Sequence, residues 1–362
     1  MTESVSWLGR ARSAFLARLL RPSRSGTNTL MVVGAIAASI LAGALTVSII
    51  GVSPVEALKV VLEGSVGSVR GLSDSLVFAT PRLLVALGAI VAVRCGVFNL
   101  GGEGQLQLGA IGAVLAGTMV GQIVAPLHIA FALLAAMAFG ALWAMLAILL
   151  KLWRGADEII VTLMMNFIGI YLVAYLVEGP LQPPDSIFNM SERIEQTSRL
   201  PVLIPGTRLH LGFLIALAGT AAVWCLLYRT SLGVQLRATG LSLSAARLQG
   251  LSTGRLMFVS MAISGAIGGL AGAGEVLGVQ FRLIEGFSSG FGFEGLAIAF
   301  LGGLEPIPVL LIAIYFGIVQ NGTTALQSTL SVPVSLVYIM VALPILFLAG
   351  VQGWRLFRGG HA

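Results

Sequence analysis

The stretch Asn99-Leu100-Gly101-Gly102-Glu103-Gly104-Gln105 separates two apolar runs, at 76–93 and 106–124. Glycine weakens a helix, and lipid offers no hydrogen-bond partners to backbone or side chain. Polar residues persist at membrane depth where protein or a water-filled cavity receives them. The stretch therefore predicts a break between two membrane helices. A bundle with such a break is expected to contain a transport pathway and not to serve only as a membrane anchor.

The composition is that of an integral membrane protein. Of the 362 residues, 57% are hydrophobic and 10% are charged, against about 25% charged in a soluble globular domain. The net charge of +6 arises mostly from basic residues in short loops between apolar runs. Membrane lipid is therefore the expected surrounding, and no nucleic-acid partner is expected.

Hydropathy divides the chain into two tails and one membrane domain. Residues 1–29 form a basic cytosolic tail, either an interfacial helix or a frayed segment, and residues 351–362 form a second tail. Between them, 30–350 is predicted to be a transmembrane domain with apolar runs at 30–50, 76–93, 106–124, 128–150, 158–177, 210–228, 257–279, 292–304, 306–325 and 333–350. We expect an all-α polytopic bundle of about 8–10 transmembrane helices with broken or re-entrant segments, because the run at 292–304 is too short to cross.

Lys and Arg residues set the orientation of a membrane protein, because they are enriched in cytosolic loops. With the basic tail inside, most basic residues fall on the cytosolic side. The basic residues assigned to outer segments are Lys59, Arg70, Arg82, Arg193, Arg199, Arg208 and Arg282. Both termini are therefore expected in the cytosol. The same alternation makes residues 179–209 an external loop and residues 229–256 the longest cytosolic loop.

Several polar side chains fall within the apolar runs. Glu158, Thr162 and Asn166 recur every four residues and form one stripe, which should face the bundle interior. Such residues either line a solute path or hydrogen-bond a neighbouring helix, and both uses remain open here. Glu275 and Glu294 are carboxylates at membrane depth, where charge is costly, and are further candidates for the solute path.

Small residues recur between 265 and 278 with a spacing of four, which favours close helix packing. The members of this pattern are Gly265, Gly268, Gly269, Gly272, Gly274 and Gly278.

The sequence carries no sign of chemistry on a substrate. It has no Gly-x-x-x-x-Gly-Lys-[Ser/Thr] loop to cradle nucleotide phosphates, and its three histidines have no metal-ligand spacing. Residues 290–295 spell Gly-x-Gly-x-x-Gly but lack the strand–helix–strand context of a dinucleotide site. No enzyme activity, metal or cofactor is therefore expected in this chain.

The cytosolic loop contains a predicted short helix. Ser242 or Ser244 is suited to cap a helix through Leu248, and Gly250 is suited to end it. A small Ala-Ala face with Leu248 exposed is a shape that docks into a groove on a partner protein, although a simple surface turn also fits these residues.

Four ordered stretches resemble the permease subunits of bacterial ABC importers, most closely the nucleoside and simple-sugar group within the branched-chain amino acid/ribose permease superfamily. They are Gly-Val-Phe-Asn-Leu-Gly-Gly-Glu-Gly-Gln at 96–105, Asp-Glu-Ile-Ile-Val-Thr-Leu-Met-Met-Asn at 157–166, Arg-Ala-x-Gly…Ala-Ala-x-x-x-Gly at 237–250, and the glycine-rich stretch 264–303. The family motif usually has Ile and Ala where this chain has Leu100 and Gly102. The added glycine favours a break further, since glycine costs a helix about 0.5–1 kcal/mol relative to alanine.

The resemblance implies that the Gly240 to Gly250 segment is a coupling helix that contacts an ATPase. The residues assigned to this contact are Arg237, Gly240, Ala245, Ala246, Arg247 and Gly250. It also suggests that Asn99, Glu103 and Gln105 belong to the solute path. If the coupling assignment holds, an Ala246→Arg substitution is expected to abolish transport in a folded chain.

The expected function is that of the permease subunit of an ATP-driven ABC importer for nucleosides or simple sugars. The resemblance implies three partners: a cytosolic ABC ATPase carrying ATP and Mg²⁺, a second, paralogous permease, and an extracytoplasmic solute-binding protein. The expected location is the bacterial inner membrane. The alternative is an ion-coupled secondary transporter of a small polar solute, whose broken helices would also explain residues 99–105.

Overall fold

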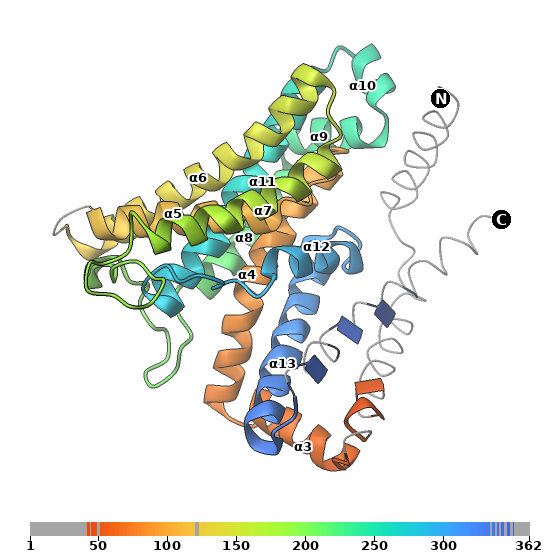
Figure 1. Cartoon of the computed structure of the whole chain (residues 1–362). Coiled ribbons are helices and arrows are strands. Elements are labelled where there is room, and N and C mark those ends of the chain that lie inside the picture. Colours follow the sequence, from red (N-terminus) through yellow and green to blue (C-terminus); the bar gives the residue numbers. More distant parts are fainter. Residues whose placement is uncertain are drawn as a thin grey trace. The chain divides into compact units, whose positions relative to one another are not determined.

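The structure is a computed structural model that describes residues 51–119 and 123–333, together with scattered residues between 42 and 48 and between 335 and 350. The predicted tails, 1–29 and 351–362, lie outside the described residues, and so do most of the apolar runs at 30–50 and 333–350. The described part is helical, with two isolated β-bridges and no strand (Figure 1).

Most of the described helices follow the apolar runs of the sequence, and the helices at 54–65, 231–241 and 243–248 lie outside them. They are α3 (Pro54–Ser65), α4 (Val69–Arg94), α5 (Gly102–Met119), α6 (Ala125–Arg154), α7 (Glu158–Glu178), α8 (Gly212–Arg229), α9 (Ser231–Leu241), α10 (Leu243–Leu248), α11 (Thr253–Glu275), α12 (Phe291–Leu301) and α13 (Pro306–Leu330). A 3-10 turn, η1 (Gln196–Ser198), and a π-helix, η2 (Val276–Gln280), complete the set. Within the described residues, 6 helices are long and apolar enough to cross a membrane, which confirms the all-α polytopic class.

Two elements differ from the sequence prediction. Residues 54–65 form α3, for which no helix was predicted. The predicted loop at 229–256 contains α9 in addition to the expected short helix. The start of α9 is fixed by Thr230, whose Oγ1 accepts the N–H of Gly233 at 3.1 Å. The run at 292–304, which was predicted to be too short to cross, forms the 11-residue helix α12.

The chain forms two compact units, residues 1–79 with 314–362 and residues 80–313. In the first unit, Asn321 of α13 is a central polar link. Its Nδ2 lies 2.8 Å from the carbonyl oxygen of Gly71, 3.3 Å from that of Gly64 and 3.1 Å from the Oγ of Ser75. One amide thereby joins α13 to α3 and to the N-terminal part of α4.

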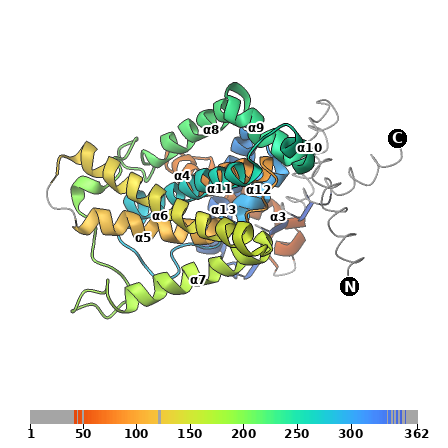
Figure 2. The ribbon, with the colours of Figure 1, turned by 90° about the horizontal axis from the view of Figure 1, so that it is seen from above.

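The second unit is built around α5, α6 and α11, which lie against one another (Figures 1 and 2). Glycines make this possible, because a Cβ on Gly269 would overlap the backbone of α6 and one on Gly272 would overlap the backbone of α5. The predicted close packing is thus confirmed for both faces of α11. Gly274 differs, since a Cβ there would meet no atom within 4 Å.

The segment between α7 and α8 packs on the π-helix η2. Leu200 donates its N–H to the carbonyl of Leu277 at 2.9 Å, and the imidazole of His210 covers Gly278 so closely that a Cβ on this glycine would overlap the ring. The π-helix ends at Phe281, whose φ of 57° is rare for a residue with a side chain. The predicted loop at 179–209 is therefore an ordered cover for the end of α11.

Candidate functional site

The predicted break lies between α4, which ends at Arg94, and α5, which begins at Gly102. Side chains of α7 bond backbone groups at and just after this break. The amide of Asn166 accepts the N–H of Gly104 at 2.8 Å and donates to the carbonyl of Leu100 at 2.7 Å, while Thr162 Oγ1 accepts the N–H of Leu100 at 3.2 Å. Two members of the predicted polar stripe thus replace the helical partners that the break removes.

Asn99 and Gln105 form hydrogen bonds within the break and connect it to α11. The Nε2 of Gln105 donates to Asn99 Oδ1 at 3.0 Å, and the same oxygen accepts the N–H of Gly101 at 2.9 Å. Asn99 also donates to the hydroxyl of Ser264 on α11 at 2.9 Å. Ser264 was not predicted from the sequence, although a serine within an apolar helix is a signal that could have found it.

Glu158 marks the start of the stripe on α7. Its carboxylate is buried and lies 2.9 Å from the Nζ of Lys151 on α6, and its carbonyl accepts the hydroxyl of Thr162 at 2.6 Å. Asp157 caps the helix by accepting the N–H of Ile159 at 2.8 Å. The whole stripe therefore hydrogen-bonds within the protein, and contact with solute remains a prediction.

Glu103 connects α5 to α12. One carboxylate oxygen accepts from Gln107 Nε2 at 3.0 Å, and the other accepts the N–H of Gly292 at 2.8 Å. The Oε1 of Gln107 is buried and has no hydrogen-bond partner among the described residues. Gln107 is a further polar residue of this interior that the sequence reasoning missed.

Arg82 corrects one sequence prediction, because it does not lie in an outer segment. It is fully buried within α4, where its Nε forms an ion pair with Glu294 and its guanidinium lies 4.8 Å from the ring centroid of Phe291. A buried arginine is tolerated here because a carboxylate from α12 compensates its charge. Hydropathy could not reveal a partner 212 residues away.

Glu275 ends α11 with only 6% of its surface exposed. The positive charges of Arg82 and Arg208 act on its carboxyl group. Its contact with solute remains a prediction.

The segment predicted to be cytosolic forms two consecutive helices, α9 and α10, at the N-terminal end of α11 (Figure 1). Ser242 caps α10 by accepting the N–H of Ala245 at 3.3 Å, and Gly250 follows with a φ of 78°. Leu248 is 90% exposed, as the docking hypothesis expects, but Ala246 is 2% exposed. The predicted Ala-Ala face is therefore wrong for Ala246, and an Ala246→Arg substitution would test folding rather than docking.

The other residues assigned to coupling attach this segment to the bundle. Gly240 packs on the backbone of Arg94 and Gly96, and Arg247 donates to the hydroxyl of Thr253 at 3.2 Å. Arg237 lies with its guanidinium 5.0 Å from the ring centroid of Tyr228. Of the residues in the 240–250 segment, Leu248 offers the most exposed large apolar side chain.

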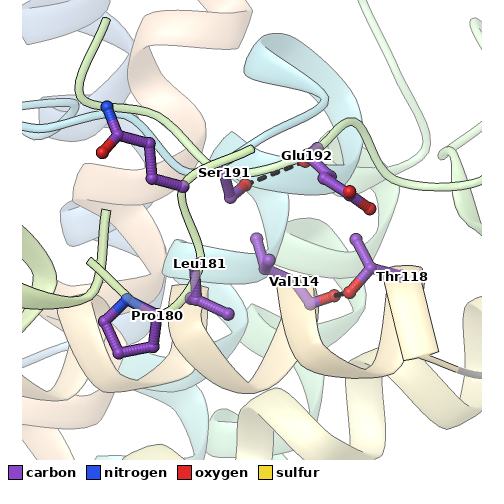
Figure 3. Close-up of a pocket in the computed structure, with 7 residues that line it drawn as sticks. Val114, Thr118, Pro180, Leu181, Ser191 and Glu192 are labelled. Atoms are coloured by element: carbon purple, nitrogen blue, oxygen red, sulfur yellow. Dashed lines mark hydrogen bonds between the residues drawn. The ribbon is translucent and has the colours of Figure 1, made fainter. Parts of the chain in front are cut away.

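A cavity of about 200 Å³ lies at the end of α5, beneath the segment that joins α7 to α8 (Figure 3). It is lined by Val114, Thr118, Pro180, Leu181, Gln182, Ser191 and Glu192. The hydroxyls of Thr118 and Ser191 donate to backbone carbonyls, each at 2.8 Å. None of the predicted solute-path residues lines this cavity, so it is separate from the buried polar interior.

Comparison with known proteins places this architecture among transport proteins. The sequence model of a family described as "Branched-chain amino acid transport system / permease component" matches residues 71–349. A guanosine ABC transporter permease protein of Bacillus subtilis (strain 168) is 34% identical over 328 residues, which are 90% of this chain and 94% of that protein. A glucose ABC transporter permease protein of Haloferax volcanii is 33% identical over 352 residues, covering 93% and 90% of the two chains. A nucleoside ABC transporter permease protein of Lactococcus lactis subsp. cremoris is 27% identical over 324 residues, covering 87% and 89%.

Proposed function

This chain belongs to the branched-chain amino acid transport system / permease component family, and we propose that it is the permease subunit of an ATP-driven ABC importer for nucleosides or simple sugars. The observation that carries the proposal is near full-length similarity to permeases named for guanosine, glucose and nucleosides. These solutes are neutral and rich in hydroxyl groups.

The charges of the interior support a neutral solute. The buried carboxylate of Glu158 is paired with Lys151, and buried Arg82 is paired with Glu294. This pairing neutralises two buried charges, one of each sign, and the amide and hydroxyl groups around the break are then the main groups that could interact with a solute. Asn99, Glu103, Gln105, Thr162 and Asn166 would rearrange their hydrogen bonds as the bundle changes its access.

ATP and Mg²⁺ would be bound by a separate cytosolic ATPase, since this sequence lacks a phosphate-cradling loop. We place its docking site on α10, with Leu248 as the apolar anchor, because an exposed apolar side chain on a short helix suits a groove. A second, paralogous permease would complete the pore. A solute-binding protein would deliver solute on the outer side of the bacterial inner membrane, with both termini of this chain in the cytosol.

Affinity purification of the tagged chain from its native membrane in mild detergent tests the ATPase assignment. We expect an ATPase with a phosphate-binding loop to co-purify with the wild-type chain and to be lost with a Leu248→Arg variant. Ile187→Arg is the matched control, because Ile187 is 92% exposed but lies in the segment at the opposite end of α8. Retention of the ATPase by Leu248→Arg would remove α10 as its docking site.

Uptake measurements test the solute and the energy source together. In membrane vesicles loaded with ATP, radiolabelled guanosine or glucose should accumulate in the presence of the binding protein and an ionophore that collapses ion gradients. If accumulation instead depends on an ion gradient and is the same with and without ATP, the chain is a secondary transporter.

A further inference from the structure

Two helices, α4 and α8, meet at the carboxylate of Glu305, which lies in the turn between α12 and α13. The Nη2 of Arg94, the last residue of α4, lies 2.5 Å from one carboxylate oxygen. The hydroxyl of Tyr228, near the end of α8, donates to the other oxygen at 2.5 Å. Both oxygens of Glu305 are therefore engaged by helices that come from distant parts of the sequence.

Arg94 also holds the backbone of this turn. Its Nε and Nη2 both lie 3.2 Å from the carbonyl oxygen of Leu304, the residue before Glu305. Leu304 has a φ of 59°, a conformation that costs a residue with a side chain of order 1–3 kcal/mol. Charge-assisted hydrogen bonds from a largely buried arginine are strong enough to hold this conformation.

The first cytosolic helix, α9, contacts both partners of Glu305. Arg237 of α9 lies over the ring of Tyr228, at 5.0 Å from its centroid. Gly240, three residues further along α9, lies so close to the carbonyl oxygen of Arg94 that a Cβ would overlap it. It also approaches Gly96, which has a φ of 83° and belongs to the break before α5.

We propose that Arg94, Tyr228 and Glu305 form a clasp that transmits movement of α9 and α10 to α4 and the break at residues 95–101. These three are positioning residues, because they act through the helices they join rather than by touching solute. The clasp rests on the proposed function, since the movement would come from the ATPase docked on α10. Packed side chains, hydrogen bonds and rigid helices carry energetic coupling between distant sites, and the clasp supplies such contacts from α9 to the polar break.

If the clasp transmits this movement, breaking it should reduce transport while leaving ATP hydrolysis intact. Tyr228→Phe removes one hydroxyl, and Glu305→Gln removes the charge while preserving the shape of the side chain. In the purified complex reconstituted in lipid vesicles, both variants should bind the ATPase and hydrolyse ATP, but guanosine taken up per ATP should fall by about five-fold or more, the lower range of coupling between sites. The double variant should lose no more than the stronger single variant, because both changes break the same unit.

Glu63→Gln is the matched control. Glu63 forms an exposed ion pair with Lys59, at 3.8 Å, and lies outside the clasp, so uptake per ATP should stay at the wild-type value. Wild-type uptake per ATP in both clasp variants, or a parallel loss of hydrolysis and uptake, would overturn the clasp. A wild-type complex that hydrolyses no ATP would overturn the proposed function, and the clasp with it.

A spectroscopic readout makes the test independent of the solute. Spin labels on Leu100→Cys of the break, which is half-buried, and on Ile187→Cys of the outer segment, in a Cys225→Ser background, report the distance between the two regions. ATP should change this distance in the wild type. In Tyr228→Phe and Glu305→Gln, movement of α9 should no longer reach the break, so the change in this distance should be at most half the wild-type change. An unaltered response relative to Ile187 would overturn the clasp even if guanosine is not the solute.

Discussion

Asn166 illustrates how one side chain maintains the broken helix. Its amide serves both the N–H of Gly104 and the carbonyl of Leu100, and it is completely buried. Asn166→Ala should therefore destabilise the protein by about 2–4 kcal/mol, because a buried backbone group left unpaired costs about 1–3 kcal/mol. Thermal unfolding in detergent measures this loss.

Asn189→Ala is the control variant for this stability measurement. The side chain of Asn189 bonds Glu178 and Glu285 at exposed positions, so its loss should change stability by less than about 0.5 kcal/mol. Unchanged stability in Asn166→Ala together with lost uptake would instead make Asn166 a solute contact.

His210 predicts a pH dependence of the segment that covers η2. Burial, reinforced by the positive charge of Arg208, lowers the pKa of His210 from 6.5 to about 4. The opened segment binds a proton below pH 6.5, whereas the packed segment excludes it until the pH nears 4, so stability is constant above pH 6.5 and falls as the pH drops toward 4. The slope is at most about 1.4 kcal/mol per pH unit.

Hydrogen exchange of residues 200–212, corrected for the intrinsic effect of pH on exchange, measures this opening. Exchange should accelerate between pH 6.5 and 5 in the wild type. A His210→Gln variant removes the titrating group, so its exchange should not depend on pH across this window. The same acceleration in both proteins would assign the effect to another group.

At the scale of elements, glycine positions decide how α11 packs. A Cβ on Gly269 would overlap the carbonyl of Ala136 on α6, so Gly269→Ala should destabilise by about 1–3 kcal/mol through overpacking. Gly274→Ala is the control in the same helix, since its Cβ would meet nothing within 4 Å and alanine gains up to about 1 kcal/mol of helix propensity. Chemical denaturation in detergent should give opposite signs for the two variants. Equal effects would show that helix propensity, not close packing, explains these glycines.

Elements were predictable where one local signal controlled them. The glycines and polar residues of 99–105 predicted the break, because helix propensity is a local property. The serines at 242 and 244 limited the start of α10 to two positions, of which the structure uses Ser242, because capping is also local. The exposure of Ala246 was not predictable, since it depends on how α9 and α10 fold back on each other. The pairing of Arg82 with Glu294 was not predictable either, because it depends on how α4 and α12 pack together in the folded chain.

At the scale of the whole molecule, the distribution of basic residues predicts the orientation. Three membrane-length helices, α4, α6 and α8, end in arginine, at Arg94, Arg154 and Arg229. Arginine is enriched at the cytosolic ends of membrane helices, so α9 and α10 should face the cytosol and the segment before α8 should face outward. The 18 residues of α8 span about 27 Å, close to the thickness of the hydrocarbon core.

A membrane-impermeant maleimide applied to intact spheroplasts distinguishes the two orientations. In a Cys225→Ser background, Ile187→Cys should react at once, whereas Leu248→Cys should react only after the membrane is opened; both positions are at least 90% exposed, so accessibility to solvent does not separate them. Cys95 is buried, and its pKa is raised to about 11, chiefly by burial, so it should stay unmodified. The reverse order of labelling would place α10 outside, where no ATPase could reach it, and would contradict both the docking site and the clasp.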